Sequence, residues 1–530
     1  MTARVTARAT IALAVADFRE RVRRPAYALF LLAAVGLARL AVPPADSGWV
    51  ILDVGGYRGV YTSAWVGTAT ALAGALWLTM GGFYLVRDAI GRDERTRVGQ
   101  LVAATPLRTP AYLLGKFLSD FLVLASMAGV LAATAPIMQL ARGESGAVDP
   151  VALLLPFATI TLPPLALTAA AAVLFETVPL LRGGVGNVVW FVVSLVLLIG
   201  GQSPKAPLGG LGVHQAADSM RAALAAQGVD VHGREFSLGL TSVARPLRTF
   251  QWDGFSVTGA FLGSRLLVLL PALVLALLPC LWFARFDPAR RLTAPAVAPY
   301  EPGVTADSGR PAFRTTSPVT PSTVPGVAPR PGRASRRLLS GELRILLQGV
   351  SRWWWLVAAG VTAAAFATPE PATVLPLAWI WPVLIWSRLG TQRVEYGVEG
   401  LLGAYPAPWR GLVAEWAAGV VLTAATGVGP LVRMAVAADW PGVGSWAGGT
   451  LLVPSLALAL GVACRTHRVF QVVYLGLWYL AVNGTAAVDY MGAVRTDGLP
   501  AGPSPLVVAC LAAALLCAAL AVRTARHAIR

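Results

Sequence analysis

The residues with the clearest chemical role lie in one charged stretch of an otherwise apolar chain, residues 86–116. Its charged side chains are those of Arg87, Asp88, Arg92, Asp93, Glu94, Arg95, Arg97, Arg108 and Lys116. Hydrophobic runs at 64–85 and 112–140 flank the stretch, and each is long enough to cross a bilayer. Because a short arginine-rich loop between two spans is normally cytoplasmic, we expect this loop to face the cell interior.

Residues 92–104 within this loop are predicted to form a short surface helix. They contain Gly99 but no proline, and they place apolar Val98, Leu101 and Val102 beside a charged face. The pair Thr105-Pro106 should end the helix, because a residue before proline avoids helical geometry. A helix lying at the membrane surface can dock onto a soluble protein.

The same pattern returns about three hundred residues later, in residues 390–416. In both stretches a glutamate precedes a glycine by five residues, and a Thr-Pro or Tyr-Pro pair follows. Two interpretations are open: solvated positive-inside loops, or docking loops for a soluble ATPase. The recurrence, the amphipathic helix and the proline favour docking. The candidate docking residues are Arg92, Glu94, Arg97, Gly99, Leu101, Thr105 and Pro106 in the first loop, and Glu395, Gly400, Leu401, Tyr405 and Pro406 in the second.

Motifs for chemistry within the chain itself are missing from the sequence. Gly115-Lys116 is followed by Phe117 and does not fit a GxxxxGK[ST] phosphate-binding loop, and neither HExxH nor GxSxG occurs. The four histidines are scattered, and the four cysteines lie in or beside apolar runs without a CxxC spacing. We therefore expect a chain that is not an enzyme and that binds no metal or cofactor, with any ATP held by a partner.

Ionisable residues close to the lipid offer a second kind of chemistry, proton coupling. Asp120 follows Lys116 by four residues, so an i, i+4 ion pair at the inner interface is expected. Glu176, Glu415 and Asp489 fall at the ends of predicted spans, where water can reach them. Since no carboxylate lies at a span centre, structural roles are favoured over proton coupling.

Composition places the chain in a membrane. Of its 530 residues 56% are hydrophobic and only 13% are charged, which is typical of a multi-spanning membrane protein. The formal net charge of +17 could indicate nucleic-acid binding, but the arginines cluster beside hydrophobic segments, so positive-inside topology accounts for them and no nucleic-acid partner is expected. The dominance of arginine over lysine hints at a bacterial protein of a high-GC genome, in the cytoplasmic membrane.

The first half, residues 1–285, is predicted to hold six spans. An amphipathic interfacial helix at residues 2–24 leads into the first of them. A signal peptide there is the other interpretation, but its removal would leave an odd number of spans. Polar loops at 43–63, 141–149 and 202–253 are placed outside, and the last contains a helical run at 213–227. The predicted spans are residues 25–42, 64–85, 112–140, 151–175, 187–200 and 261–283.

The second half, residues 338–530, repeats this order after a linker. Residues 286–337 are rich in proline, serine, threonine and glycine, which predicts a disordered or polyproline-like cytoplasmic linker. An amphipathic segment at 338–352 again leads into six spans. The prediction is an all-α integral membrane protein of about 12 transmembrane helices in two parallel six-helix repeats, with both termini cytoplasmic. The second set of spans is 353–367, 372–387, 411–437, 446–464, 469–488 and 506–522.

The charged loop resembles the first cytoplasmic loop of the type 2 ATP-binding-cassette (ABC) exporter permeases. The resemblance rests on the Glu-x-x-x-x-Gly, Leu, Thr-Pro and Leu-Leu-Gly-Lys steps within residues 86–116. It implies an amphipathic connecting helix, six spans per half, and a coupling helix that seats on a separate ABC ATPase subunit, present as two copies or two different chains. It also implies export of a drug-like, peptide or lipid-like compound. The second half departs from the motif, with Tyr405-Pro406 for Thr-Pro and Glu415-Trp416 for Gly-Lys.

Two other functions compete with this one. A proton-coupled secondary transporter of the major-facilitator type also has twelve spans, a long central linker and a charged motif between spans two and three. In that family the loop is very tight, whereas residues 86–116 form a long one, and the amphipathic helices are unexplained. A non-transporting membrane scaffold would predict no dependence on ATP.

Overall fold

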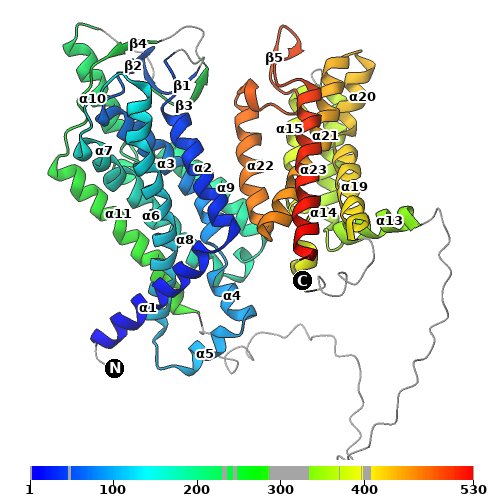
Figure 1. The fold of residues 1–530 in the computed structure, drawn as a ribbon, viewed down its shortest axis with the longest axis horizontal. Coiled ribbons are helices and arrows are strands. Elements are labelled where there is room, and N and C mark those ends of the chain that lie inside the picture. Colours follow the sequence, from blue (N-terminus) through cyan, green and yellow to red (C-terminus); the bar gives the residue numbers. More distant parts are fainter. Residues whose placement is uncertain are drawn as a thin grey trace, which may run out of the picture.

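A computed structural model describes residues 3–45, 49–203, 205–229, 236–242, 247–283, 286, 334–368, 371–395, 397 and 408–528. Figure 1 shows two groups of helices side by side, α1 to α11 and α13 to α23. The two ends of the chain lie at the same end of the helices as α4 and α5, and the strands lie at the opposite end. Residues 287–333 of the predicted linker lie outside the described residues.

The helices of the first half follow the predicted spans in order. The predicted interfacial helix is α1 (Ala3–Val22), which meets α2 at an angle of 78°. The fourth span consists of α7 (Pro150–Pro156), a π-helical turn and α8 (Leu162–Thr177). The other apolar helices of this half are α2 (Pro25–Ala41), α3 (Ser63–Val86), α6 (Thr109–Arg142), α9 (Gly184–Gly200) and α11 (Gly259–Leu277).

The second half begins with α13 (Ala334–Leu347), four residues earlier than the predicted domain boundary. Pro382 interrupts the predicted eighth span, which therefore consists of α15 (Pro371–Ile380) and α16 (Val383–Trp386). The ninth bends by 59° between α19 (Pro408–Thr426) and α20 (Val428–Val436). The remaining helices are α14 (Arg352–Ala367), α17 (Gln392–Glu395), α21 (Trp440–Cys464), α22 (His467–Val482) and α23 (Pro505–Ala528).

The described helices make this a predominantly helical, membrane-embedded protein. Six of them are long and apolar enough to cross a membrane, or up to eight if each bent pair is one span. The other predicted spans correspond to shorter helices: α9 has 17 residues, α14 and α22 have 16, and α15 has 10. A transmembrane helix needs about 20 residues. These four helices are shorter than that, so the predicted count of twelve spans is not confirmed.

A β-sheet corrects the expectation of an all-helical chain. The strands β1 (Trp49–Val54), β2 (Tyr57–Gly59), β3 (Phe236–Ser242) and β4 (Arg248–Phe250) form a sheet in the order β3-β1-β2-β4, with only the β2–β4 pair parallel. Two of the polar loops that the sequence analysis placed outside, residues 43–63 and 202–253, thus fold together. The helix predicted within the second loop is present as α10 (Val213–Ala226), and it contacts β1.

Each half is built around one buried helix. The apolar segment of α3 is 78% buried and that of α21 is 72% buried within the protein. Two further helix contacts recur within each half. In the first half α1 packs on α6 and α8 packs on α11; in the second half α13 packs on α19 and α21 packs on α23. Each amphipathic helix thus lies against the third apolar segment of its own half.

Gly67 sets how closely α3 approaches α7, which gives a test of this packing. A Cβ at Gly67 would lie 2.5 Å from the backbone oxygen of Leu153. We expect Gly67→Ala to destabilise the protein by about 1–3 kcal/mol, because the helices must move apart. Gly129 of α6 has nothing within 4 Å of the same position, so Gly129→Ala should have little effect. Thermal unfolding in detergent checks both variants, and equal midpoints would contradict the packing.

The ion pair of Arg58 with Glu144 should make the stability of the region around the four-stranded sheet depend on pH. Burial raises the pKa of Glu144, but hydrogen bonds from Arg58 (2.9 Å) and the Tyr61 N–H (3.0 Å), with the charge of Arg58, outweigh it and lower this pKa below its ordinary value. A carboxylate with a lowered folded pKa stabilises the protein above its unfolded pKa, about 4.3, and this contribution is lost as pH falls through the folded value.

We therefore expect wild type to unfold at a higher temperature than Glu144→Gln at neutral pH, with the difference shrinking below about pH 4. Tryptophan fluorescence during heating, repeated across this pH range, measures it. A difference that stays constant with pH would contradict the role of the carboxylate charge.

Candidate functional site

The charged loop between α3 and α6 contains two short helices. These are α4 (Ala89–Arg95) and α5 (Val98–Ala104), and Arg97 between them has a positive φ of 60°. The prediction of one helix over residues 92–104 is therefore wrong at Thr96-Arg97, where the chain turns. The predicted end is confirmed, because Thr105 follows α5 in extended geometry and its hydroxyl donates to the Val102 carbonyl (2.7 Å).

The start of α4 is held by Glu176 from the end of α8. Its carboxylate accepts hydrogen bonds from the backbone N–H groups of Asp88, Ala89 (2.9 Å) and Ile90 (2.6 Å). These N–H groups have no partner within the helix, and a negative charge is favourable beside them. Glu176 is only 4% exposed, so the expectation that water reaches this side chain is wrong.

A buried ion network ties α4 to α1 and α6. Lys116 of α6 is fully buried, and its Nζ lies 2.6 Å from a carboxylate oxygen of Asp17 and 2.6 Å from one of Asp93. Arg92 adds contacts to Asp17 (2.8 Å) and to Glu20 on α1. Charges taken out of water are tolerated only when they are paired in this way. The network therefore fixes the position of α4 against α1 and α6.

Asp120, one turn deeper on α6, pairs with a different partner from the one expected. Its carboxylate is fully buried and lies 2.6 Å from Arg21 of α1, whereas Lys116 turns to Asp17 and Asp93. The predicted i, i+4 pair of Lys116 with Asp120 is thus wrong, because α1 supplies a partner to each of them, Asp17 to Lys116 and Arg21 to Asp120. Arg21 and Asp120 make a second ion pair between the same two helices.

The orientation of α1 explains why its residues were missed. Thr10, Ala14, Asp17 and Arg21 recur at helical spacing and are all buried, whereas Ile11 is 57% exposed. The polar stripe of α1 therefore faces the protein, and apolar side chains are left on the outside, where an interfacial helix meets lipid. The spacing of Asp17 and Arg21 by four residues was the available signal, since it places an acid and a base on one face.

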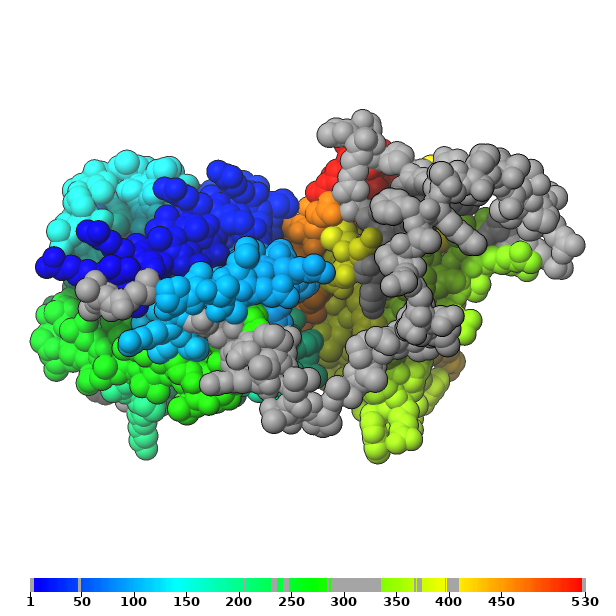
Figure 2. Space-filling model, turned by 90° about the horizontal axis from the view of Figure 1, so that it is seen from below, coloured from blue at the N-terminus to red at the C-terminus, as the bar shows by residue number. Residues whose placement is uncertain are grey.

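The candidate residues of the first loop divide into anchored and exposed ones. Arg92 belongs to the ion network, and Glu94 lies 2.8 Å from Arg182. Gly99 is buried beneath the ring of Phe286, where a Cβ would be 2.8 Å from the ring. The exposed ones are Arg97, Leu101, Thr105 and Pro106, with Leu101 at 71%. Figure 2 shows this loop (light blue) on the lower face of the molecule, beside α1 (dark blue).

The second loop is described only in part. Gly400, Leu401, Tyr405 and Pro406 lie outside the described residues. Glu395 ends α17, and the Nδ1 atom of His467 is 2.7 Å from its carboxylate. This hydrogen bond lowers the pKa of Glu395 below its ordinary value. Glu395 is therefore anchored to α22 within the second half.

An ion pair of the first loop recurs in the second. Arg393 donates to Glu342 of α13 (3.1 Å), as Arg92 donates to Asp17 of α1 (2.8 Å). Arg92 precedes Glu94 by two residues and Arg393 precedes Glu395 by two, so the arginines hold matching positions. Glu415 of α19 lies 3.9 Å from Arg393 and, at 3% exposed, is buried rather than wetted as expected. In both halves the loop is tied to the amphipathic helix before it.

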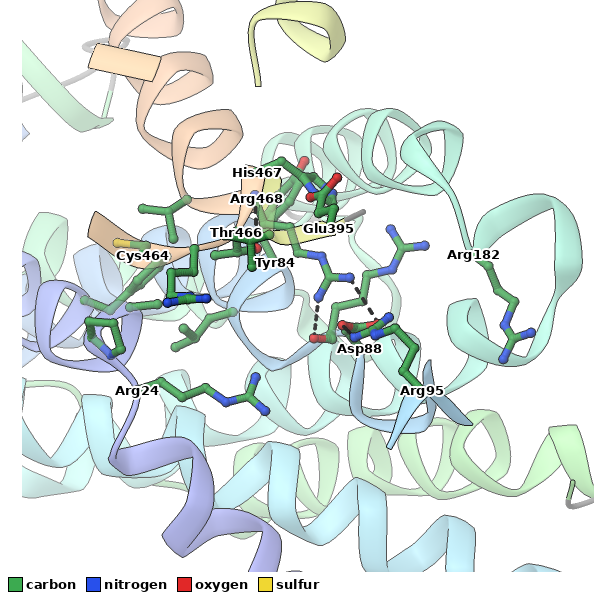
Figure 3. A pocket seen from close by; sticks show the side chains of 18 residues that line it. Arg24, Tyr84, Asp88, Arg95, Arg182, Glu395, Cys464, Thr466, His467 and Arg468 are labelled. Atoms are coloured by element: carbon green, nitrogen blue, oxygen red, sulfur yellow. Dashed lines mark hydrogen bonds and ion pairs between the residues drawn. The ribbon is translucent and has the colours of Figure 1, made fainter. Parts of the chain in front are cut away.

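The two halves make polar contacts with each other beside the start of α4. Asn187 of α9 donates to Gln471 of α22 (2.5 Å), and Arg468 donates to the Arg87 carbonyl (2.7 Å). A cavity of about 700 Å³ opens beside these contacts. Figure 3 shows Arg468 reaching Asp88 from the second half, with Arg24, Arg95 and Glu395 around it.

Within the described part of the chain, no group of three or more His, Cys, Asp or Glu side chains is placed to hold a metal ion. Comparison with known protein families, with curated proteins and with solved structures gives no match. The charged loops and the cavity between the halves are the features of the described chain that bear on its function.

Removing the charge at the centre of the network should loosen the anchored loop. We expect Lys116→Met to lower the free energy of unfolding by about 3–5 kcal/mol, because Asp17 and Asp93 then lose a buried partner. Lys205, the only other lysine, is exposed on the outer loop, so Lys205→Met serves as the control and should unfold as wild type. Thermal unfolding and limited proteolysis at Arg95 and Arg97 measure the change. Equal stability of the two variants would contradict the role of the network.

Proposed function

We propose that the chain is the membrane permease subunit of an ATP-binding-cassette exporter. It would move a drug-like, peptide or lipid-like compound across the bacterial cytoplasmic membrane, with its termini and charged loops in the cytoplasm. ATP would be hydrolysed by separate nucleotide-binding subunits, either two copies of one chain or two different chains. This chain would be a transport subunit rather than an enzyme.

The anchoring of α4 is the observation that carries the proposal. A loop that transmits force from an ATPase must move together with the spans, and a loosely solvated loop cannot do so. Lys116, Asp17 and Asp93 join α4 to α6 and α1, and Glu176 joins it to α8. A push on α4 and α5 would therefore reach three helices at once.

The exposed tip of the loop supplies a surface for the ATPase. Leu101 and Val98 of α5 are 71% and 42% exposed, next to the charged side chains of Arg95 and Arg97. Apolar side chains rimmed by charge are typical of a protein contact surface. The anchored helix α4 is thus suited to transmit movement to the other helices, and the exposed face of α5 is suited to bind the ATPase.

The recurrence of the anchoring supports two docking loops. Arg393 with Glu342 repeats the pairing of Arg92 with Asp17, and α13 packs on α19 as α1 packs on α6. Two parallel repeats of six spans would give each ATPase subunit one loop to act upon. Of residues 395–406 in the second loop, the structure describes Glu395 and Gly397.

A proton-coupled secondary transporter of the major-facilitator type is the second candidate, and one observation favours it. Asp120 is a fully buried carboxylate within α6, and such groups are often functional in membrane proteins. Its partner Arg21, at 2.6 Å, gives it a structural role as well. The ABC exporter proposal also explains why the charged loop is anchored to the helices, which the secondary transporter does not, and we prefer it for that reason.

Replacing one exposed leucine tests the docking surface. We expect Leu101→Asp to reduce co-purification of a co-expressed ATPase subunit, encoded beside this chain, by about tenfold or more, because a charge replaces an apolar contact. Leu180 is equally exposed (74%) but lies on the 3-10 turn after α8, so Leu180→Asp is the matched control and should retain the ATPase.

Two results would contradict the proposal. One is equal retention of the ATPase by both leucine variants. The other is transport by the purified chain alone in vesicles, driven by a proton gradient and abolished by Asp120→Asn, which would establish the secondary transporter in its place.

A further inference from the structure

The cavity between the halves is lined by segments of both. The first half contributes the turn between α1 and α2, part of α2, the end of α3, Arg95 of α4 and Arg182 after α8. The second half contributes the end of α17 and the segment from the end of α21 to the start of α22. Asp88 and Arg95, at the two ends of α4, belong to its lining, so the cavity lies at the end of the helices that carries α4. A ligand there would contact both halves at once.

Positive charge dominates the described lining of this cavity. Its carboxylates are those of Asp88 and Glu395, and both already have partners: Arg95 (3.1 Å) and Arg468 (3.4 Å) at Asp88, and His467 at Glu395. Low-dielectric walls concentrate the field of such a charge excess and attract anions. The arginines of the lining are Arg24, Arg87, Arg95, Arg182, Arg465 and Arg468.

Arginine side chains face the cavity from opposite sides. In Figure 3 Arg24 extends from the turn between α1 and α2 toward Asp88 and Arg95, and Arg468 reaches the same place from the second half. The bonds of Arg24 to Glu20 use its Nε and Nη2 atoms, so its Nη1 group can donate elsewhere. Guanidinium groups match phosphate and carboxylate oxygens in geometry and charge.

Another part of the lining is apolar. Ala26 and Phe30 of α2, Leu85 of α3 and Val469 of α22 border the same cavity as the arginines. An inorganic anion bound to the arginines would make no contact with this apolar wall. A molecule with an anionic group and an apolar body would satisfy both kinds of surface.

We propose that this cavity binds the anionic group, a phosphate or carboxylate, of an amphiphilic compound. The arginines of the two halves hold the anion between them, and its charge offsets the repulsion that the arginines exert on one another. The further statement that this compound is the cargo, an anionic lipid-like molecule, rests on the proposed exporter function. Binding itself does not depend on an ATPase.

The test measures binding to the purified full chain in detergent, without any ATPase. Dioctanoyl phosphatidylglycerol is the anionic amphiphile, dioctanoyl phosphatidylcholine has the same tails without net charge, and inorganic pyrophosphate is the free anion. The thermal unfolding midpoint is followed as each probe is added. The cavity variant Arg24→Gln/Arg465→Gln is compared with Arg221→Gln/Arg248→Gln, which removes two charges from the outer region.

We expect phosphatidylglycerol to raise the midpoint of wild type and of the outer variant, with an apparent affinity at least fivefold weaker in the cavity variant. Phosphatidylcholine should be at least fivefold weaker on wild type. High salt should weaken phosphatidylglycerol binding to wild type, which keeps the proposal testable if the cavity variant does not fold.

Three results would overturn the proposal: pyrophosphate raising the midpoint as much as phosphatidylglycerol, no difference between the two lipids, or equal loss in the cavity and outer variants. Failure of the exporter function is seen separately, as an ATPase that does not co-purify. The cargo statement fails alone if phosphatidylglycerol binds yet leaves the ATPase rate of an assembled complex unchanged.

Discussion

The contact of Lys116 with two aspartates is the interaction on which the arrangement of the charged loop against the helices depends. Asp17 comes from the amphipathic helix, Asp93 from the charged loop and Lys116 from a long apolar helix. Because the lysine is fully buried, its charge cannot be left to water, and the three elements must stay together. A loop that hydropathy alone would place freely in solvent is thereby fixed to the helices.

Hydropathy predicted the helices well because apolar length is a local property of the chain. Residues 64–85 and 112–140 appear as Ser63–Val86 and Thr109–Arg142, each within three residues of the expected limits. Hydropathy could not predict the four-stranded sheet. Its strands β1 and β3 are separated by most of the first half, and neither has a strong strand-forming pattern of its own. Long-range pairing depends on tertiary context more than on propensity.

The charged side chains were harder to predict than the helices. A base four residues before an acid, as in Lys116 and Asp120, indicates a pair only if no other element competes, and α1 does compete. Glu176 was expected in water because it ends a span, yet the start of α4 covers it. The matching pairs Arg92–Asp17 and Arg393–Glu342 were hidden because their acidic members lie far from the loops in sequence.

Backbone hydrogen exchange of α4 tests the central claim, that this loop is anchored to the helices. The first N–H groups of a helix have no acceptor within the helix, so slow exchange at Ala89 and Ile90 requires packing of α4 on the protein together with an outside acceptor such as Glu176. We predict slow exchange at these two amides in wild type and fast exchange in Glu176→Ala, which leaves no side-chain acceptor at this position. Fast exchange at both amides in the wild-type protein would contradict the account, because α4 would then be a solvated loop free of the network.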